Sequence, residues 1–361
     1  ILFLNNDLMT DIEQIQKVSN EPTIIRKGHL AEKIIIVDGY PGCGKTLFSP
    51  IIASMERVEL LNYAFEIEFL CRLFHFNKID EDATISLIKM FIDHKLYQTM
   101  MGRETNFRYS DISSVFNDSN PWRYFKRIFQ EGDVIVPDRI KKERPILNLT
   151  THDLLSMSTP IFNALGDRLT FVEVVRHPLY SLIQQTLNME NLTSSPRDIQ
   201  IYIKHKDSQI PYYAHNWENL FVSSNAIEKS IYTLQKSYEL TKKNRLRLMK
   251  KYNKQILTIP FEQFVLNPFP FVEKIANLIG SEITPKTKKI MKKQNVPRKK
   301  ISDGIPLEIY KRCGWEPPEK TLSENGELRK RRDFAIDSGA SNQAIDTLDI
   351  LIEDYENFFK I

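Results

Sequence analysis

The sequence predicts an α/β fold in which a central parallel sheet is flanked by helices on both faces. The run Ile34-Ile35-Ile36-Val37 is apolar at every position, as expected of a strand that is buried on both faces. A glycine-rich turn, Gly39 to Thr46, follows this run directly. Further β-branched runs alternate with helical segments along the chain, and this alternation is typical of parallel sheets.

The other elements are expected in the same alternation. Helices are expected at 45–55 and 225–252, and a helical, aromatic-rich insert at about 57–131. Further strands are expected at 134–136, 146–149, 169–175 and 255–259. We therefore expect an N-terminal helix (11–18) and linker within 1–30, an α/β domain at 31–316, and a helical segment at 317–361 that packs on this domain.

Composition narrows the class of protein. The formal net charge is +4, but the charge is uneven, because 286–300 carries eight lysines or arginines and no acid. Such a run suits an anionic partner, or it is a solvated helix face. Cys43, Cys71 and Cys313 show no zinc or disulfide spacing, which favours a reducing compartment. No apolar stretch reaches the ~20 residues of a membrane span. We expect a cytoplasmic protein with no nucleic-acid partner.

The turn after the first strand matches a phosphate-binding pattern, Gly39-x-x-x-x-Gly44-Lys45-Thr46. Glycines let backbone N–H groups point inward around a phosphate, and the helix that follows adds its positive N-terminal end. Lys45 adds a charge, and Thr46 adds a hydroxyl. The motif lies between a buried strand and a helix, as the chemistry requires. The sequence therefore predicts a P-loop-type domain that binds a nucleotide phosphate.

Other polar residues follow the later strands and should gather at the same edge of the sheet, where ligands bind in such folds. They are His152, Arg176 and Glu262. P-loop kinases and NTPases place a metal-binding acid at the end of a neighbouring strand. The candidates here, Asp138 and Glu262, do not follow a clear apolar run, and His152 stands where such an acid is expected. This pattern favours a transfer that needs no metal.

Three segments, taken together, resemble the sulfotransferase family, which uses 3′-phosphoadenosine 5′-phosphosulfate (PAPS). Gly39 to Leu47 resembles the family's loop for the 5′-phosphosulfate. Arg144 to His152 (RPILNLTTH) is similar to the strand that ends in Lys-Thr-His, whose histidine is the catalytic base. Phe171 to Leu179 resembles the strand and turn that bind the 3′-phosphate. Weaker similarities lie at 259–276 and around Arg298, so the resemblance spans about 34–315 in separate segments.

The resemblance implies a set of site residues. Lys45 would stabilise the transferring group, and His152 would be the base, since imidazole titrates near working pH. Glu66 is the alternative base, because some branches of the family use a glutamate after the loop helix. The implied donor-binding residues are Pro41, Gly42, Cys43, Gly44, Lys45, Thr46, Leu47, Arg176, Ser181, Gln184, Arg298, Lys299 and Lys300.

The sequence departs from the family pattern at three positions. Gly42 and Thr150 stand where the family has lysines, and Gln184 stands where it has a serine. The first hypothesis is a PAPS-dependent sulfotransferase that acts on a hydroxyl or amine without a metal. The alternative is a P-loop kinase or NTPase that uses ATP or GTP with Mg²⁺, and a third reading is a non-enzymatic polyanion-binding protein. The sequence does not identify the acceptor, although the cluster Tyr212, Tyr213, His215 and Trp217 suits either an acceptor site or core packing.

Overall fold

A computed structural model of the chain describes residues 22–109, 111–193, 195–252, 255–304 and 322–360. The N-terminal helix expected at 11–18 and Cys313 lie outside these residues. The strands are β1 (Lys33–Asp38), β2 (Asn62–Tyr63), β3 (Ile146–Thr150), β4 (Leu169–Val175), β5 (Tyr202–His205), β6 (Ser208–Pro211) and β7 (Ile256–Pro260).

The helices follow the strands in alternation up to β7. In chain order they are α2 (Lys45–Ala53), α3 (Phe65–His75), α4 (Glu81–Met101), α5 (Trp122–Ile128), α6 (Ile135–Glu143), α7 (Thr159–Leu165), α8 (Pro178–Asn191), α9 (Glu218–Ser223), α10 (Ala226–Tyr252), α11 (Phe261–Leu266), α12 (Phe269–Ile279), α13 (Pro285–Lys293), α15 (Glu324–Asp337) and α16 (Asn342–Phe359).

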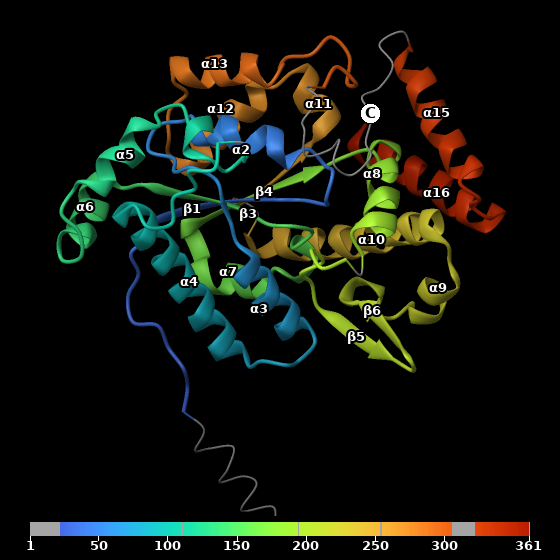
Figure 1. The fold of residues 1–361 in the computed structure, drawn as a ribbon, viewed down its shortest axis with the longest axis horizontal. Coiled ribbons are helices and arrows are strands. Elements are labelled where there is room, and N and C mark those ends of the chain that lie inside the picture. The colour runs from blue at the N-terminus through green and yellow to red at the C-terminus, as the bar shows by residue number, and fades with distance from the viewer. Residues whose placement is uncertain (1–21, 110, 194, 253–254, 305–321, 361) are drawn as a thin grey trace, which may run out of the picture.

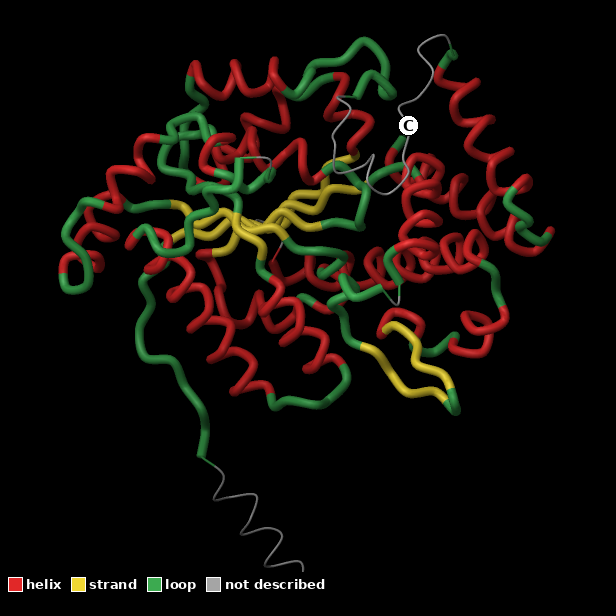
Figure 2. The backbone as a smooth tube through the Cα atoms, viewed as in Figure 1, coloured by secondary structure: helices red, strands yellow, loops and turns green. Residues whose placement is uncertain are grey.

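The central sheet has five parallel strands in the order β2-β3-β1-β4-β7 (Figures 1 and 2). Strand β1 lies at its centre and shows why the sequence folds this way. Ile34 and Ile36 pack with α3, α4 and α7 on one face, while Ile35 and Val37 pack with α2, α12 and α13 on the other. Because successive side chains of a strand alternate between faces, a continuous apolar run fills both layers. The predicted three-layer α/β fold is confirmed.

The C-terminal helices complete a third apolar cluster beside the sheet. α8, α10 and α16 meet through Leu182, Ile231 and Leu348, and α15 joins them through Ala335. A separate antiparallel hairpin, β5-β6, lies below α8 and α9 in Figure 1. Thus the helices α15 and α16 reach back to the carboxyl end of β4, where α8 begins.

One predicted strand is wrong, and two elements were not predicted. Residues 134–136 do not form a strand but enter helix α6, in which Val136 and Ile140 make a buried stripe one turn apart. Pro137 is tolerated there because the first turn of a helix needs no N–H partner for it. The two elements that were not predicted are the short strand β2 and the hairpin β5-β6. The strands at 146–149, 169–175 and 255–259 are confirmed to within one residue at each end.

Candidate active site

The glycine-rich turn wraps from the end of β1 into the first turn of α2. Gly44 precedes α2 with a φ of 101°, and a Cβ atom at this position would overlap the ring of Phe261. Gly39 is equally restricted, because a Cβ there would overlap the carbonyl oxygen of Val174. These two positions need glycine for both conformation and space. The loop therefore presents its backbone and the N-terminus of α2 at the carboxyl edge of the sheet.

Lys45 places its charge inside this loop. Its ammonium Nζ donates to the carbonyl oxygens of Gly39 at 2.5 Å and Tyr40 at 3.2 Å, and the side chain is buried. The neighbouring side chains of Cys43 and Leu47 belong to the apolar core, and Cys43 also lines the small cavity beside Arg176. Burial also raises the pKa of the Cys43 thiol. The loop thus offers one cation and a set of N–H groups to an anion.

Two arginines lie beside the loop against the ring of Phe261. The guanidinium of Arg176, which follows β4, lies 4.5 Å from the ring centroid, and that of Arg298 lies 5.4 Å from it. Arg176 also donates from Nη1 to the carbonyl oxygen of Gly42 at 2.6 Å, whereas its buried Nε has no hydrogen-bond partner among the described residues. Burial lowers the pKa of Arg298 to about 10, and the nearby charge of Arg176 adds to this. Two partly buried cations side by side without a shared counter-ion favour an anionic ligand.

The other residues predicted to bind the donor lie around Arg176 and Arg298, and they differ in how far they are exposed to solvent. Ser181 is buried on α8 and lines a small cavity with Arg176, and Gln184 lies against Gly42. Lys299 is exposed, while Lys300 donates from Nζ to the carbonyl oxygen of Leu322 at 3.2 Å. Thr46 is partly exposed at the start of α2. The structure thus places Arg298, and not the lysines after it, against Arg176.

Sequence reasoning missed two further residues, one that contacts the loop and one that lies near Arg176. Gln185, next to the predicted Gln184, donates from Nε2 to the carbonyl oxygen of Pro41 at 2.7 Å. Arg331 of α15 lies 4.8 Å from the ring centroid of Tyr180, and the guanidinium of Arg176 lies 5.4 Å from the same centroid. No motif around Arg331 indicated this position, because it depends on how α15 packs on α8.

A cavity of about 390 Å³ adjoins the loop on its other side. Its wall is rich in aromatic and polar side chains, and it includes His152. The lining residues are Tyr40, Pro41, Tyr63, Phe65, Glu68, Arg72, His152, Asp153, Gln185, Asn188, Met189, Leu192, Thr193, Asp198, Ile199, Gln200, Tyr212, Tyr213 and Thr233. Trp217 instead packs in the third apolar cluster, and His215 is paired with Glu218 at 3.0 Å. The predicted aromatic cluster is therefore divided between the cavity wall and the core.

His152 is held by a buried carboxylate. Its Nδ1 lies 3.0 Å from Oε1 of Glu68, which also accepts the backbone N–H of His152 at 3.0 Å. Arg72 donates to the other oxygen of Glu68 at 2.7 Å and to the carbonyl oxygen of His152 at 3.3 Å. A carboxylate on Nδ1 fixes the tautomer and leaves Nε2 to accept a proton. The His152 side chain keeps 30% of its exposure, so the ring remains accessible from the cavity.

The aromatic wall holds the His152 ring in a fixed plane. The rings of Tyr63 and Phe65 are parallel to it within 7°, with centroid distances of 6.2 and 5.7 Å. Both residues lie on β2 or directly after it, and β2 pairs with the end of β3 that precedes His152. This explains how a two-residue strand, which the sequence did not reveal, positions the imidazole.

The alternative base, Glu66, lies elsewhere on the same helix. It is 45% exposed and pairs with Lys95 of α4 at 3.7 Å, and it does not line the cavity. α3 begins at Phe65, so Glu66 and Glu68 differ by two residues and project from nearly opposite sides of the helix. The geometry therefore brings Glu68, not Glu66, to His152.

Asp153 joins the loop and the cavity, and the sequence analysis did not single it out. It lines both the cavity of His152 and the small cavity of Arg176, and its N–H donates to the carbonyl oxygen of Gly39 at 3.1 Å. Burial raises the pKa of Asp153 to about 7, and the Asp38 carboxyl contributes to this rise. Asp38 itself anchors the segment after β3, because it accepts from Oγ1 of Thr151 at 2.7 Å.

The two acids proposed for a metal have other positions or partners. Asp138 lies on α6, an exposed helix rather than a strand end, and it pairs with Lys141 at 3.5 Å. Glu262 is buried and accepts from the N–H of His177 and the hydroxyl of Tyr355, each at 3.0 Å. Among the described residues, no group of three or more His, Cys, Asp or Glu side chains is arranged to hold a metal ion.

Comparisons with known proteins leave the family open. No protein-family model matches the chain, and no curated protein matches it. Among solved structures, the sulfotransferase domain from the curacin biosynthetic pathway is 11% identical, with a TM-score of 0.40 over 84% of this chain and 96% of that one. A sulfotransferase from Mycobacterium avium is 12% identical, with a TM-score of 0.41 over 98% of this chain and 81% of that one. A mouse sulfotransferase complexed with PAP is 11% identical, with a TM-score of 0.39 over 92% of this chain and 86% of that one. Such low TM-scores decide neither the reaction nor the site residues.

Proposed function

We propose that the protein transfers a sulfuryl group from PAPS to a hydroxyl or amine of an acceptor, with His152 as the base. The observation that carries the proposal is the arginine pair beside the phosphate loop. Arg176 and Arg298 lie within 5.4 Å of one ring centroid, that of Phe261, and offer two cations to an anion beside the loop. A second anion site suits a donor that carries a phosphate on its 3′ oxygen as well as the phosphosulfate at its 5′ end.

The residues present fit such a donor. The loop supplies N–H groups, the N-terminus of α2 and the Lys45 ammonium for the 5′ end. The unpartnered Nε of Arg176 and the lowered pKa of Arg298 support a phosphate between or beside the two guanidiniums. Gly42 takes the place of a family lysine, and Lys45, whose Nζ reaches back to Gly39, can supply the missing charge.

His152 would take the proton of the acceptor. As the acceptor oxygen or nitrogen forms its bond to sulfur, its proton passes to Nε2 of His152, and the S–O bond to the donor phosphate breaks. Glu68 stabilises the imidazolium that results, because it lies 3.0 Å from Nδ1. Lys45 and the loop N–H groups stabilise the charge that develops on the transferred group and on the leaving bisphosphate.

The acceptor enters the cavity that His152 shares with Tyr63, Phe65 and Tyr212. These aromatic side chains suit an acceptor that presents an apolar or ring-shaped face. Polar side chains such as Asn188 and Gln200 lie in the same wall and would orient it.

Calorimetric titration tests the proposal directly. Adenosine 3′,5′-bisphosphate and ATP are titrated separately, each with Mg²⁺ and with a chelator. We expect tight binding of the bisphosphate that does not depend on the metal, with weak binding of ATP. Binding of ATP that requires Mg²⁺, with no response to the bisphosphate, would overturn the proposal.

A P-loop kinase or NTPase is the second candidate, and one observation favours it. Asp153 follows β3, the strand next to β1, and lies near enough to Lys45 for their charges to interact. This is the place of the metal-binding acid in many P-loop enzymes. If the second candidate is right, Asp153→Asn should abolish the dependence of ATP binding on Mg²⁺.

A further inference from the structure

The end of the molecule opposite to the loop exposes an unusual group of apolar side chains. Tyr109 is 80%, Trp122 71%, Phe129 87% and Val134 87% exposed, and Phe116 and Ile128 are also exposed. We call these six residues, on and around α5, the apolar rim. Phe116 and Trp122 pack on the ring of Phe125, with centroids 6.1 and 5.6 Å away. Exposed apolar side chains gathered on and around one helix in this way are typical of an interaction surface.

A cationic face lies near the apolar rim. Helix α13 carries five exposed lysines, Lys286, Lys288, Lys289, Lys292 and Lys293, and no acid. Within the part of the chain that the structure describes, none of the five forms an ion pair. Its apolar residues, including Ile290 and Met291, face the core instead. The basic run noted in the sequence is therefore a solvent-facing surface, which we call the lysine face.

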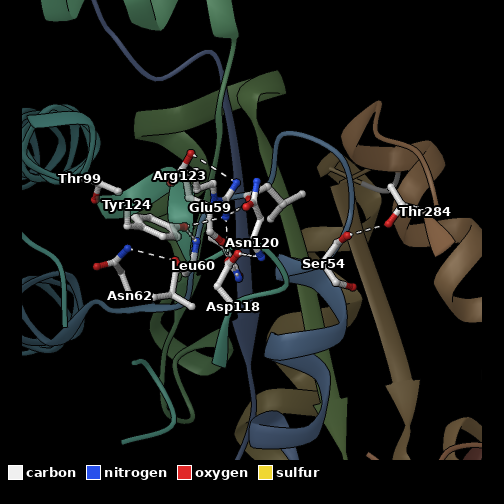
Figure 3. A network of polar contacts seen from close by, with 12 residues as sticks. Ser54, Glu59, Leu60, Asn62, Thr99, Asp118, Asn120, Arg123, Tyr124 and Thr284 are labelled. Atoms are coloured by element: carbon white, nitrogen blue, oxygen red, sulfur yellow. Dashed lines mark hydrogen bonds and ion pairs between the residues drawn. The ribbon is translucent and has the colours of Figure 1, made fainter. Parts of the chain in front are cut away.

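Helix α5, which carries Trp122 and Ile128 of the apolar rim, and Lys286 of the lysine face border one hollow of about 790 Å³, although none of the six rim side chains lines it. Arg123 and Lys126 of α5 line one side, and Thr284 and Lys286 line the other. Figure 3 shows Arg123 and Thr284. Glu59, inside the hollow, is neutralised by Arg127 through contacts of 2.7 and 2.8 Å. Two exposed acids, Glu56 and Glu143, also lie on the border, so the surface is cationic on balance but not uniformly.

We propose that this end of the protein docks onto an anionic lipid surface. Aromatic side chains favour the interface between water and lipid, and clustered lysines are attracted to acidic headgroups. The aliphatic members of the rim, Ile128 and Val134, gain from insertion into lipid but offer nothing for a nucleic-acid base to stack on. A symmetric contact with a second copy would bring like-charged lysine faces toward each other. Since the loop and His152 lie at the carboxyl edge of the sheet, docking leaves the active site open.

Flotation with lipid vesicles tests this inference independently of the reaction. The full chain is mixed with vesicles of phosphatidylcholine alone or with added phosphatidylserine, at low and high salt. Binding is expected only to the vesicles that contain phosphatidylserine, and it should weaken as salt rises. An absence of flotation with these vesicles at low salt would overturn the inference, and so would equal flotation with neutral vesicles.

Two pairs of variants separate the two surfaces. Lys288→Gln with Lys292→Gln should lower the partition coefficient roughly 30-fold, since each cation near an anionic surface contributes about 1 kcal/mol. Trp122→Ala with Phe129→Ala should lower the partition coefficient at least ~10-fold, because two large aromatic side chains no longer bury apolar surface in the lipid. The matched controls, Lys78→Gln with Lys204→Gln and Val222→Ala with Leu240→Ala, change exposed residues elsewhere and should have little effect.

One further result would reassign the surface. If the protein dimerises in light scattering, and Trp122→Ala with Phe129→Ala abolishes the dimer without changing flotation, the rim is a contact between two copies. Bisphosphate binding, measured on each variant, verifies that the loop end remains folded. The expected finding is that the variants lose flotation, remain monomeric and bind the bisphosphate as before.

Discussion

Two carboxyl groups at opposite ends of the sheet, one buried and one partly buried, differ in the direction of their pKa shifts. Glu59, labelled in Figure 3, lies at the amino end of β3, where its N–H donates to the carbonyl oxygen of Ile146. Burial would raise the pKa of Glu59, but Arg127 and Arg123 outweigh burial and lower it. Asp153 lies at the carboxyl end, where burial and Asp38 raise its pKa to about 7.

The difference separates a part that supports the fold from a part that awaits a ligand. At the amino end, Glu59 is bonded to Arg127 through both oxygens, and Arg123 pairs with Asp118 at 2.9 Å. At the carboxyl end, Asp153 lies near another acid, Asp38, as well as near Ser237 and Arg72, and burial still raises its pKa. Arg298 lies near another arginine as well as near Asp303, and burial still lowers its pKa. Such perturbed pKa values are a frequent sign of a functional site. The following predictions test whether this contrast holds.

The largest effect is expected from His152→Ala. We expect turnover to fall by about 10²- to 10⁴-fold, the usual contribution of a general base. Bisphosphate binding should be unchanged, because the arginine pair and the loop are untouched. Steady-state sulfuryl transfer and calorimetry measure the two effects. The matched control is Glu66→Gln, which should retain turnover; loss of activity in this variant, with full activity in His152→Ala, would move the base to Glu66.

At the amino end, Glu59→Gln should damage stability rather than chemistry. Removing one partner of a buried ion pair costs about 3–5 kcal/mol, since Arg127 is left buried and charged. Because the folded-state pKa of Glu59 is lowered, its stabilising contribution is present above the ordinary glutamate pKa and is lost as the pH falls through the folded-state value. Urea unfolding near neutral pH measures the change. Glu239→Gln, which breaks an exposed pair with Lys236, should cost less than about 1 kcal/mol.

An unchanged free energy of unfolding in Glu59→Gln would contradict the structural role of the amino end. Turnover per folded molecule is the second readout. It should equal that of the unmodified protein, because Glu59 lies far along β3 from His152.

Arg176→Ala should weaken bisphosphate binding about 10- to 150-fold, the value of one or more hydrogen bonds to a charged group. Binding of adenosine 5′-phosphate, which lacks the 3′-phosphate, should change much less. Calorimetry measures the loss of affinity for each nucleotide, and the ratio of the two losses is the readout. Arg332→Ala removes an exposed arginine that pairs with Asp349 at 2.7 Å and serves as the control. Equal losses for both nucleotides would show that Arg176 supports the loop through Gly42 and does not read the 3′-phosphate.

The contrast also explains which features the sequence could predict. The mainly apolar runs predict four of the five sheet strands, because strands that are buried on both faces carry mostly apolar side chains. At 134–136 the same residue types form a helix, since the next buried position, Ile140, follows at helical spacing. The phosphate loop is local, so its pattern is visible in one segment. Arg331 and Glu68 are not visible, because the first depends on the packing of α15 and the second on where α3 begins.

The smallest effect is expected from Asp153→Asn, and it has the opposite sign to that of Glu59→Gln. An acid whose pKa is raised on folding takes up a proton as the chain folds, so its contribution to stability falls as the pH rises from about 4 to about 7 and is constant above. The asparagine variant has no such penalty. Its free energy of unfolding should exceed that of the unmodified protein by roughly 2 kcal/mol at pH 8, half of what a shift of this size carries, because Asp153 is partly exposed.

Urea unfolding of both proteins between about pH 5 and pH 8 measures this gap, which should widen with pH over the range set by the two pKa values. A gap of constant size would mean that Asp153 is ionised and paired with Arg72 or Lys45 in the folded protein. In that case the carboxyl end would be internally neutralised, as the amino end is. Because the donor is an anion, the same variant should also bind the bisphosphate more tightly above about pH 7, where the carboxylate would otherwise repel it. Stability and bisphosphate binding should therefore improve together in Asp153→Asn only if Asp153 does not neutralise Arg72 or Lys45 in the folded protein.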